Sequence, residues 1–133
     1  MQLYGFFRSS AAFRVRIGLN LKAIPYDYIA VDLRSGEQFS DDYRTINPQS
    51  RVPCLSNGDD PLIQSMAILE YLDETHPEPP FLPGDPPARA RVRGLANIIA
   101  CDIHPLNNLA VLEYLRHEMK VEKDSIQGWY RNW

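Results

Sequence analysis

Residues 3–17 read LYGFFRSSAAFRVRI, and this stretch decides the fold. A short apolar run, predicted as a strand over residues 2–7, stops at a polar turn, and a helical pattern over residues 10–22 follows at once. Ser9 and Ser10 stand at the junction. The first N–H groups of a helix are unpaired and point beyond its start, and hydroxyls there can donate to an anion, including a thiolate. No Cys lies nearby, so a thiol held at this turn would belong to a ligand.

A second strand is predicted directly after this helix. Residues 26–31 are rich in aromatic and β-branched side chains, which favour a strand. Strand, helix and strand then form a βαβ unit with a right-handed crossover. Gly18 lies beside the apolar stripe of the helix, where the absence of a side chain would permit close packing.

The remaining elements of the first half complete the order β-α-β-α-β-β-α. A short helix is expected over residues 38–44. Two short strands, 52–56 and 61–63, flank a hairpin turn at residues 57–60. Ser65 stands where a helix N-cap is expected, ahead of apolar residues at helical spacing.

A proline-rich segment divides the chain. We predict a first domain over residues 1–76, a semi-rigid linker over 77–87, and a helical domain over 88–133. Pro105 falls inside the first helical run of that domain and predicts a kink or a break there. A further helical stretch is expected over residues 125–133.

Composition excludes several classes of protein. The net charge of −3 argues against a nucleic-acid-binding surface. A small basic cluster would spread around a helix as a solvated face; it consists of Arg89, Arg91 and Arg93. Cys54 and Cys101 suggest neither a disulfide framework nor metal-ligand spacing. No signal peptide and no membrane-spanning run is expected, so a cytoplasmic location is the default.

Several motifs, taken in order, resemble the zeta class of the cytosolic glutathione transferases and the bacterial maleylpyruvate and maleylacetoacetate isomerases. They are RSSAAFRVRI (8–17), NPQSRVP (47–53), LIQSMAILEYL (62–72), CDIHPLNNL (101–109) and LEYLR (112–116). Motifs in the right order over nearly the whole chain are far more specific than one short pattern.

The resemblance implies an α/β thioredoxin-like N-terminal domain, followed by an incomplete all-α glutathione-transferase C-terminal domain. Members of the family continue through several more helices, so a chain that ends at Trp133 looks like a fragment or a truncated product. Ala11 stands where the family signature usually has Cys, and Phe13 where it often has Trp.

The resemblance also suggests catalytic residues. Ser9 is expected as the principal donor to the sulfur of glutathione and Ser10 as the second; by themselves, two serines at a helix start are more often plain N-caps. A hydrogen bond to a thiolate and the helix N-terminus both lower the pKa of the thiol. Arg8, at the mouth of the site, is expected to hold a substrate carboxylate.

Glutathione is the expected cofactor. The resemblance implies a cis peptide bond between Val52 and Pro53, which would turn the main-chain N–H and C=O of Val52 toward the cysteinyl part of glutathione. The plainer alternative is a Pro that only opens a strand. Gln64 and Ser65 are expected to take the γ-glutamyl end at a helix start, and Gln38 the glycyl end. His104 and Asn108 are assigned to the glutathione or substrate side of the cleft, while no metal site is expected.

The function implied is the glutathione-dependent cis–trans isomerisation of maleylpyruvate or maleylacetoacetate to the fumaryl product, in aromatic-compound degradation. The substrate would be a small dicarboxylic molecule and the protein a homodimer. Two alternatives remain open. One is a general glutathione transferase or dehalogenase, and the other a non-catalytic glutathione-binding dimerisation module.

Overall fold

The computed structural model describes residues 1–58 and 60–133. Within these residues the chain forms two compact units, Met1–Phe81 and Leu82–Trp133, which are described separately. Asp59, part of the predicted turn at residues 57–60, lies outside the described residues.

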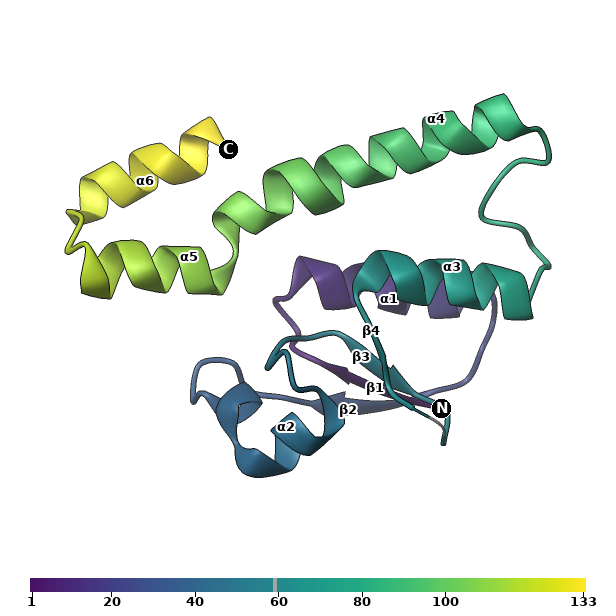
Figure 1. The fold of residues 1–133 in the computed structure, drawn as a ribbon, viewed down its shortest axis with the longest axis horizontal. Coiled ribbons are helices and arrows are strands. Elements are labelled where there is room, and N and C mark those ends of the chain that lie inside the picture. The colour runs from purple at the N-terminus through teal and green to yellow at the C-terminus, as the bar shows by residue number, and fades with distance from the viewer. Residues whose placement is uncertain (59) are drawn as a thin grey trace. The chain divides into compact units, whose positions relative to one another are not determined.

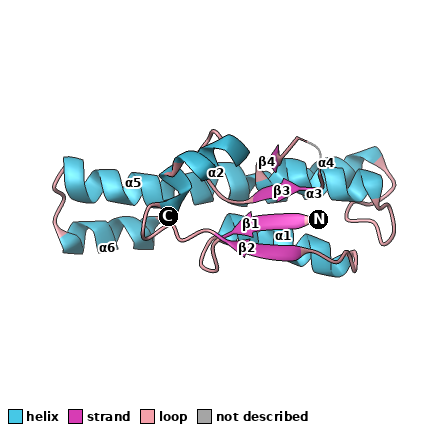
Figure 2. Ribbon diagram, turned by 90° about the horizontal axis from the view of Figure 1, so that it is seen from below, coloured by secondary structure: helices cyan, strands magenta, loops and turns pink. Residues whose placement is uncertain are grey.

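The first unit contains a mixed four-stranded sheet of order β2-β1-β3-β4. β1 pairs in parallel with β2 and antiparallel with β3, which pairs antiparallel with β4. Figure 2 shows β1 between β2 and β3. The strands are β1 (Gln2–Gly5), β2 (Asp27–Ala30), β3 (Cys54–Ser56) and β4 (Leu62–Ile63).

Helices cover both faces of this sheet. α1 (Ser10–Leu21) and α3 (Ser65–Thr75) lie side by side on one face, and α2 (Asp41–Ile46) lies on the other (Figure 1). A 3₁₀ turn, η1 (Glu37–Phe39), precedes α2, so the helix predicted over residues 38–44 is divided in two at Ser40. The order β-α-β-α-β-β-α and the thioredoxin-like fold are confirmed.

The core lies between the sheet and the pair α1 and α3. Its fully buried side chains come from β1, α1, β3 and α3, and are Leu3, Val15, Leu19, Leu55, Ile68 and Leu72. Gly18 allows α1 and α3 to approach closely, because a Cβ at this position would lie 2.4 Å from Leu69 Cδ2. The predicted close packing at Gly18 is therefore confirmed.

One prediction about α3 is wrong. The N-cap residue is Gln64, with φ 70° and ψ 113°, and Ser65 is the first residue of the helix. The Gln64 side chain makes no capping hydrogen bond. Ser is a common N-cap residue, and nothing in the local pattern indicates that Gln64 adopts a positive φ.

A buried ion pair fastens the end of α1 to α3 and to the start of the proline-rich segment. Lys22 Nζ lies 2.7 Å from Asp73 Oδ1 and donates to the Pro79 carbonyl at 2.7 Å. The same Asp73 oxygen accepts from the Phe81 N–H at 2.7 Å, and Lys22 Nζ lies 4.2 Å from the Phe81 ring centroid. The Lys22 side chain is fully buried, and these partners compensate its positive charge.

The second unit is helical throughout its regular elements. α4 (Pro86–Asn97) continues through a π-helical segment η2 (Ile98–Ile103) and a 3₁₀ segment η3 (His104–Asn107). Asn108 then begins α5 (Leu109–Glu113), which continues into the π-helical segment η4 (Tyr114–Glu118), and α6 (Lys123–Asn132) follows. The irregularity predicted around Pro105 is present, since the backbone leaves helical geometry at Asn108, with ψ 160°.

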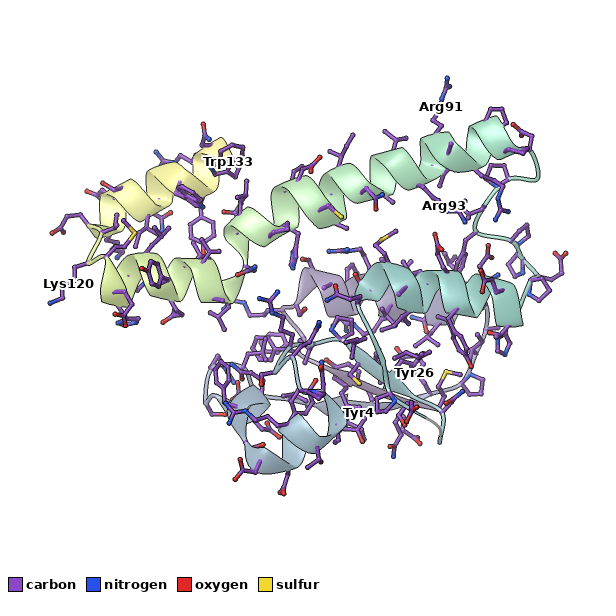
Figure 3. All side chains as sticks on the ribbon, in the orientation of Figure 1. Tyr4, Tyr26, Arg91, Arg93, Lys120 and Trp133 are labelled. Atoms are coloured by element: carbon purple, nitrogen blue, oxygen red, sulfur yellow. The ribbon has the colours of Figure 1, made fainter. Side chains whose placement is uncertain are left out.

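The small core of this unit joins α5 and α6. Leu112 and Ile126 are buried, and Trp129 Nε1 donates to the Leu106 carbonyl at 2.9 Å. On α4, Arg91 and Arg93 project from opposite sides of the helix (Figure 3), as expected for a spread basic cluster. Trp133, also labelled there, lies against Trp129 with ring centroids 6.2 Å apart.

The expectation of no membrane-spanning run needs one correction. The helical run Pro86–Glu118 holds an 18-residue window with mean hydropathy 1.2, which is long and apolar enough to cross a membrane by length and composition alone. The run is not one continuous α-helix, because Asn108 is extended and its Oδ1 caps α5 by accepting from the Val111 N–H at 3.0 Å. The apolar residues of this window include Leu95, Ile98 and Ile99, whose side chains are exposed to solvent in this structure.

Candidate functional site

The turn between β1 and α1 presents the hydroxyl of Ser9. The Ser9 N–H donates to the Phe6 carbonyl at 2.9 Å and closes the turn. Ser9 is the N-cap of α1, and its Oγ accepts from the Ala12 N–H at 3.2 Å. Because Oγ accepts in this bond, its own O–H remains able to donate. Capping and anion binding are therefore compatible at the same side chain.

The turn forms one wall of an open depression of about 310 Å³. Two lining residues carry a guanidinium, two a hydroxyl and two an aromatic ring: Arg8, Arg16, Ser9, Ser10, Phe7 and Phe13. None of these lining residues carries a carboxylate. The structure thus brings the three predicted catalytic residues to one electropositive surface, with Arg8 and Ser10 exposed and Ser9 half-buried.

Arg16 is a member of this surface that the sequence reasoning missed. It lies on α1 seven residues after Ser9, a spacing that places two side chains on the same face of a helix. Arg16 Nη2 donates to the Phe7 carbonyl at 3.4 Å, and its guanidinium carbon lies 4.9 Å from the Phe13 ring centroid. The helical spacing from Ser9 could have identified it.

Hydrogen bonds from buried polar side chains hold the loop before Pro53. Asn47 is fully buried; its Nδ2 donates to the Arg51 carbonyl at 2.7 Å and its Oδ1 accepts from the Gln49 N–H at 3.0 Å. The Tyr43 hydroxyl donates to the same Arg51 carbonyl at 2.7 Å. The Val52–Pro53 peptide bond that follows is cis, as the resemblance implied. Asn47 and Tyr43 were not predicted to have a role here.

Two hydrogen bonds connect this loop and α1 to the start of α3. Gln64 Nε2 donates to Gln49 Oε1 at 2.9 Å. Arg14 Nη1 donates to Ser65 Oγ at 2.9 Å, between residues 51 positions apart in the chain. Gln64 and Ser65 are thus held beside the loop that carries Val52, and Arg14 and Gln49 are further residues that local sequence reasoning missed.

Gln38 carries a buried acceptor without a partner. Its side chain is 5% exposed, and its Oε1 has no hydrogen-bond partner among the described residues. A buried amide oxygen without a partner is costly, and a ligand N–H can satisfy it. This atom is consistent with a peptide ligand at this position.

The second unit holds the remaining predicted residues. His104 begins the 3₁₀ segment η3, and Asn108 caps α5 with its side chain. Both are partly buried within their own unit.

The two cysteines lie in different units, one buried and one exposed. Cys54 is buried in β3, and burial raises the pKa of its thiol to about 11, so the group stays protonated near neutral pH. Cys101 is exposed in the second unit. Over residues 1–58 and 60–133 no group of three or more His, Cys, Asp or Glu side chains could hold a metal ion.

Comparison with known proteins identifies a family and close relatives for this chain. Residues 1–74 match the family described as glutathione S-transferase, N-terminal domain. A maleylpyruvate isomerase of a Ralstonia species is 48% identical over 133 residues, which cover 100% of this chain and 63% of that protein.

Solved structures agree with this match. The holo structure of a zeta-class bacterial maleylpyruvate isomerase has a TM-score of 0.97 at 48% identity, covering 100% of this chain and 63% of that one. A maleylacetoacetate isomerase of Methylobacterium extorquens, with bound malonate and glutathione, has a TM-score of 0.96 at 47% identity, covering 99% and 62%. The chain therefore spans less than two thirds of the length of these relatives.

Proposed function

Because the chain belongs to the zeta class of glutathione transferases, the family of the maleylacetoacetate and maleylpyruvate isomerases, we propose that it binds glutathione and isomerises a cis maleyl acid to its trans, fumaryl form. The observation that carries the proposal is the Ser9 hydroxyl, which caps α1, retains its proton for donation and opens onto a depression lined by two guanidinium groups. Maleylpyruvate and maleylacetoacetate are the candidate substrates.

The residues present fit glutathione. Ser9 supplies a donor for the sulfur at a helix N-terminus, and Gln38 supplies a buried oxygen that needs a donor. In this proposal the peptide lies along the main chain of Val52. Its γ-glutamyl carboxylate meets Gln64 and Ser65 at the start of α3, where free N–H groups favour an anion. We assign the glycyl end to Gln38, and His104 and Asn108 to the glutathione or substrate side.

When bound, glutathione would supply a nucleophilic thiolate, which is the chemistry that a reversible cis–trans isomerisation of a maleyl double bond needs. The residues of this chain would stabilise the negative charge on the sulfur. The Ser9 O–H, with Ser10 as a second donor, favours the deprotonated sulfur by hydrogen bonding. The N–H groups at the start of α1 add a positive potential. Together they stabilise negative charge where the reaction needs it.

Arg8 holds a substrate carboxylate in this mechanism. It is exposed at the edge of the depression, and a guanidinium binds a carboxylate through two parallel hydrogen bonds. The structure from Methylobacterium extorquens contains malonate, a dicarboxylate, together with glutathione. That pairing of ligands in a relative supports a dicarboxylic substrate here.

The test compares turnover of maleylpyruvate and maleylacetoacetate with and without glutathione, in the wild type and in Ser9→Ala. Ser40→Ala is the matched control, because Ser40 caps α2 in the same way, with Oγ accepting from the Tyr43 N–H at 3.2 Å. Each substitution removes one N-cap and costs about 1 kcal/mol of stability. Only Ser9→Ala is expected to raise the pKa of the bound thiol and to lower turnover.

The outcomes separate the alternatives. Glutathione-dependent turnover that is unchanged in Ser9→Ala would remove Ser9 from the mechanism. Faster turnover of a small α-halo acid than of either maleyl acid, at equal concentration, would favour a general transferase or dehalogenase. Glutathione binding by calorimetry without turnover of any of these compounds would favour a binding module, and gel filtration would then test whether that module is the expected dimer.

A further inference from the structure

We propose that Arg16 is the positioning residue of the turn that carries Arg8 and Ser9, and that its guanidinium is the second positive charge favouring an anionic sulfur in the depression. The inference rests on the proposed function, since it names a further residue acting on the same bound thiol. Arg16 would act on that thiol in two ways, by holding the turn that carries Ser9 and by placing a positive charge nearby. It would not itself react.

Arg16 supports the turn between β1 and α1. The chain from Phe6 to Ser9 is closed by the Ser9 N–H on the Phe6 carbonyl. The next carbonyl, that of Phe7, accepts from Arg16 Nη2, nine residues further along the chain. Two consecutive carbonyls are therefore held, one by the turn itself and one by α1. The residues that follow them directly are Arg8 and Ser9.

Two aromatic rings lie close to the guanidinium of Arg16. Its carbon lies 4.9 Å from the Phe13 ring centroid and 5.8 Å from that of Tyr28, both within cation–π range. Arg16 Nε is buried and has no hydrogen-bond partner in the described part of the chain. A side chain held between two rings and one carbonyl keeps its charge at the wall of the depression and retains N–H donors.

The charge of Arg16 acts on its neighbours at this wall of the depression. Burial raises the pKa of Tyr28, and the nearby charge of Arg16 partly opposes that rise by favouring the ionised hydroxyl. Arg34 lies over the rings of Phe6 and Phe7, but its Nε is 3.0 Å from Asp32 Oδ1, and that carboxylate offsets its charge. Arg8 is the remaining cation that lines the depression.

Two substitutions test the charge of Arg16. Arg16→Gln loses the charge and, because its side chain is shorter, also the donor that reaches the Phe7 carbonyl, whereas Arg16→Lys keeps a charged donor of similar reach and loses only the planar fork. Arg44→Met is the control for loss of one positive charge, because Arg44 is exposed on α2 and is not one of the residues that line the depression. The readouts are glutathione affinity by calorimetry and the pKa of the bound thiol from its ultraviolet absorbance against pH.

We expect Arg16→Gln to raise the pKa of the bound thiol by at least about half a unit, since an opposite charge nearby shifts a pKa by an amount of this order or more. Arg16→Lys should shift it by less than half as much, and Arg44→Met should not shift it. A residue that only supports the fold would lower the melting temperature and leave the thiol pKa unchanged.

The inference is overturned if the wild type binds glutathione with a lowered thiol pKa and Arg16→Gln does the same. It is equally overturned if the Arg16→Lys shift is as large as that of Arg16→Gln. If the wild type binds no glutathione, the proposed function itself fails, and the role of Arg16 fails with it. Arg16→Lys is the more conservative change and gives a second reading if Arg16→Gln does not fold.

Discussion

Lys22 of α1 and Asp73 of α3 form an ion pair of 2.7 Å whose lysine side chain is fully buried. Removing one partner leaves the other charge buried without compensation, which typically costs about 3–5 kcal/mol. We therefore expect Asp73→Asn to lower the free energy of unfolding by about 3 kcal/mol in urea titrations, and the double variant Lys22→Met/Asp73→Leu to lose less than Asp73→Asn.

The exposed pair Asp32 and Arg34 provides the control for this prediction. Its side chains are 40% and 67% exposed, and pairs in water contribute little to stability. Asp32→Asn should leave the urea midpoint unchanged. A double variant at positions 22 and 73 that is less stable than Asp73→Asn would show that the ion pair itself, rather than an isolated charge, determines the outcome.

Arg14 and Ser65 should affect the affinity for glutathione rather than the acidity of its thiol. Arg14 Nη1 holds Ser65 Oγ at the start of α3, where we place the γ-glutamyl carboxylate. A hydrogen bond to a charged group contributes roughly 1.5–3 kcal/mol, so Arg14→Met should raise the dissociation constant about tenfold or more. Calorimetry measures this, with Arg44→Met as the control.

The same variant distinguishes the two ends of the site. The thiol pKa in Arg14→Met should match that of the wild type, in contrast to Arg16→Gln. An equal shift of the thiol pKa in both variants would mean that the two arginines act on one common element.

Alkaline pH should destabilise the protein through Cys54. Burial raises the pKa of this thiol from 9.0 to about 11 in the folded chain. Below pH 9 the thiol is protonated in both the folded and the unfolded states, and the full stabilisation is present. Between pH 9 and 11 the unfolded chain loses a proton that the folded chain retains, so the free energy of unfolding falls as pH rises.

Thermal unfolding at a series of pH values checks this prediction. Cys54→Ala should show a shallower fall of the melting temperature above pH 9 than the wild type. Burial also raises the pKa of Tyr43, so part of the alkaline fall should remain in the variant. Parallel curves for the two proteins would exclude the Cys54 thiol as a source of the pH dependence.

Gly18 should be intolerant of a side chain. A Cβ there would lie 2.4 Å from Leu69 Cδ2, so the terminal methyl of Leu69 must move. Overpacking typically costs about 1–3 kcal/mol, and the helical preference for alanine offsets up to about 1 kcal/mol of that cost. Gly18→Ala should therefore lower the urea midpoint. Gly94→Ala is the matched control, because Gly94 lies inside α4 and, apart from its chain neighbours and the nearby backbone of its own helix, no described atom lies within 4 Å of its Cβ position.

At Gly94 we expect the change in stability to have the opposite sign from that at Gly18. Alanine is favoured over glycine inside a helix by up to about 1 kcal/mol, so Gly94→Ala should be neutral or stabilising. A loss of stability at position 94 comparable to that at position 18 would argue against close packing as the cause.

The sequence predicts the elements of the first unit well because their signals are local. The apolar run before Ser9, the helical stripe after it and the glycine at position 18 all depend on neighbours within a few residues. The same locality explains the misses. The bonds from Arg14 to Ser65 and from Lys22 to Asp73 each join residues 51 positions apart, and a spacing of this length carries no periodic signal.

Other misses have a different physical cause. The positive φ of Gln64 shifts the start of α3 by one residue, although Ser65 is a good N-cap type. The π-helical segments of the second unit share the apolar spacing of ordinary helix, so that their extra residue per turn is not visible in the sequence.

The Arg51 carbonyl accepts two hydrogen bonds, one from the Tyr43 hydroxyl and one from the Asn47 amide, and both donors come from the same short stretch of chain. These two bonds restrict the loop that leads to Val52. A restricted loop has less backbone entropy to lose when a peptide settles against it, and favourable contacts then appear more fully in the affinity. Under the proposed function, this restraint would contribute to the affinity of the site for a small tripeptide.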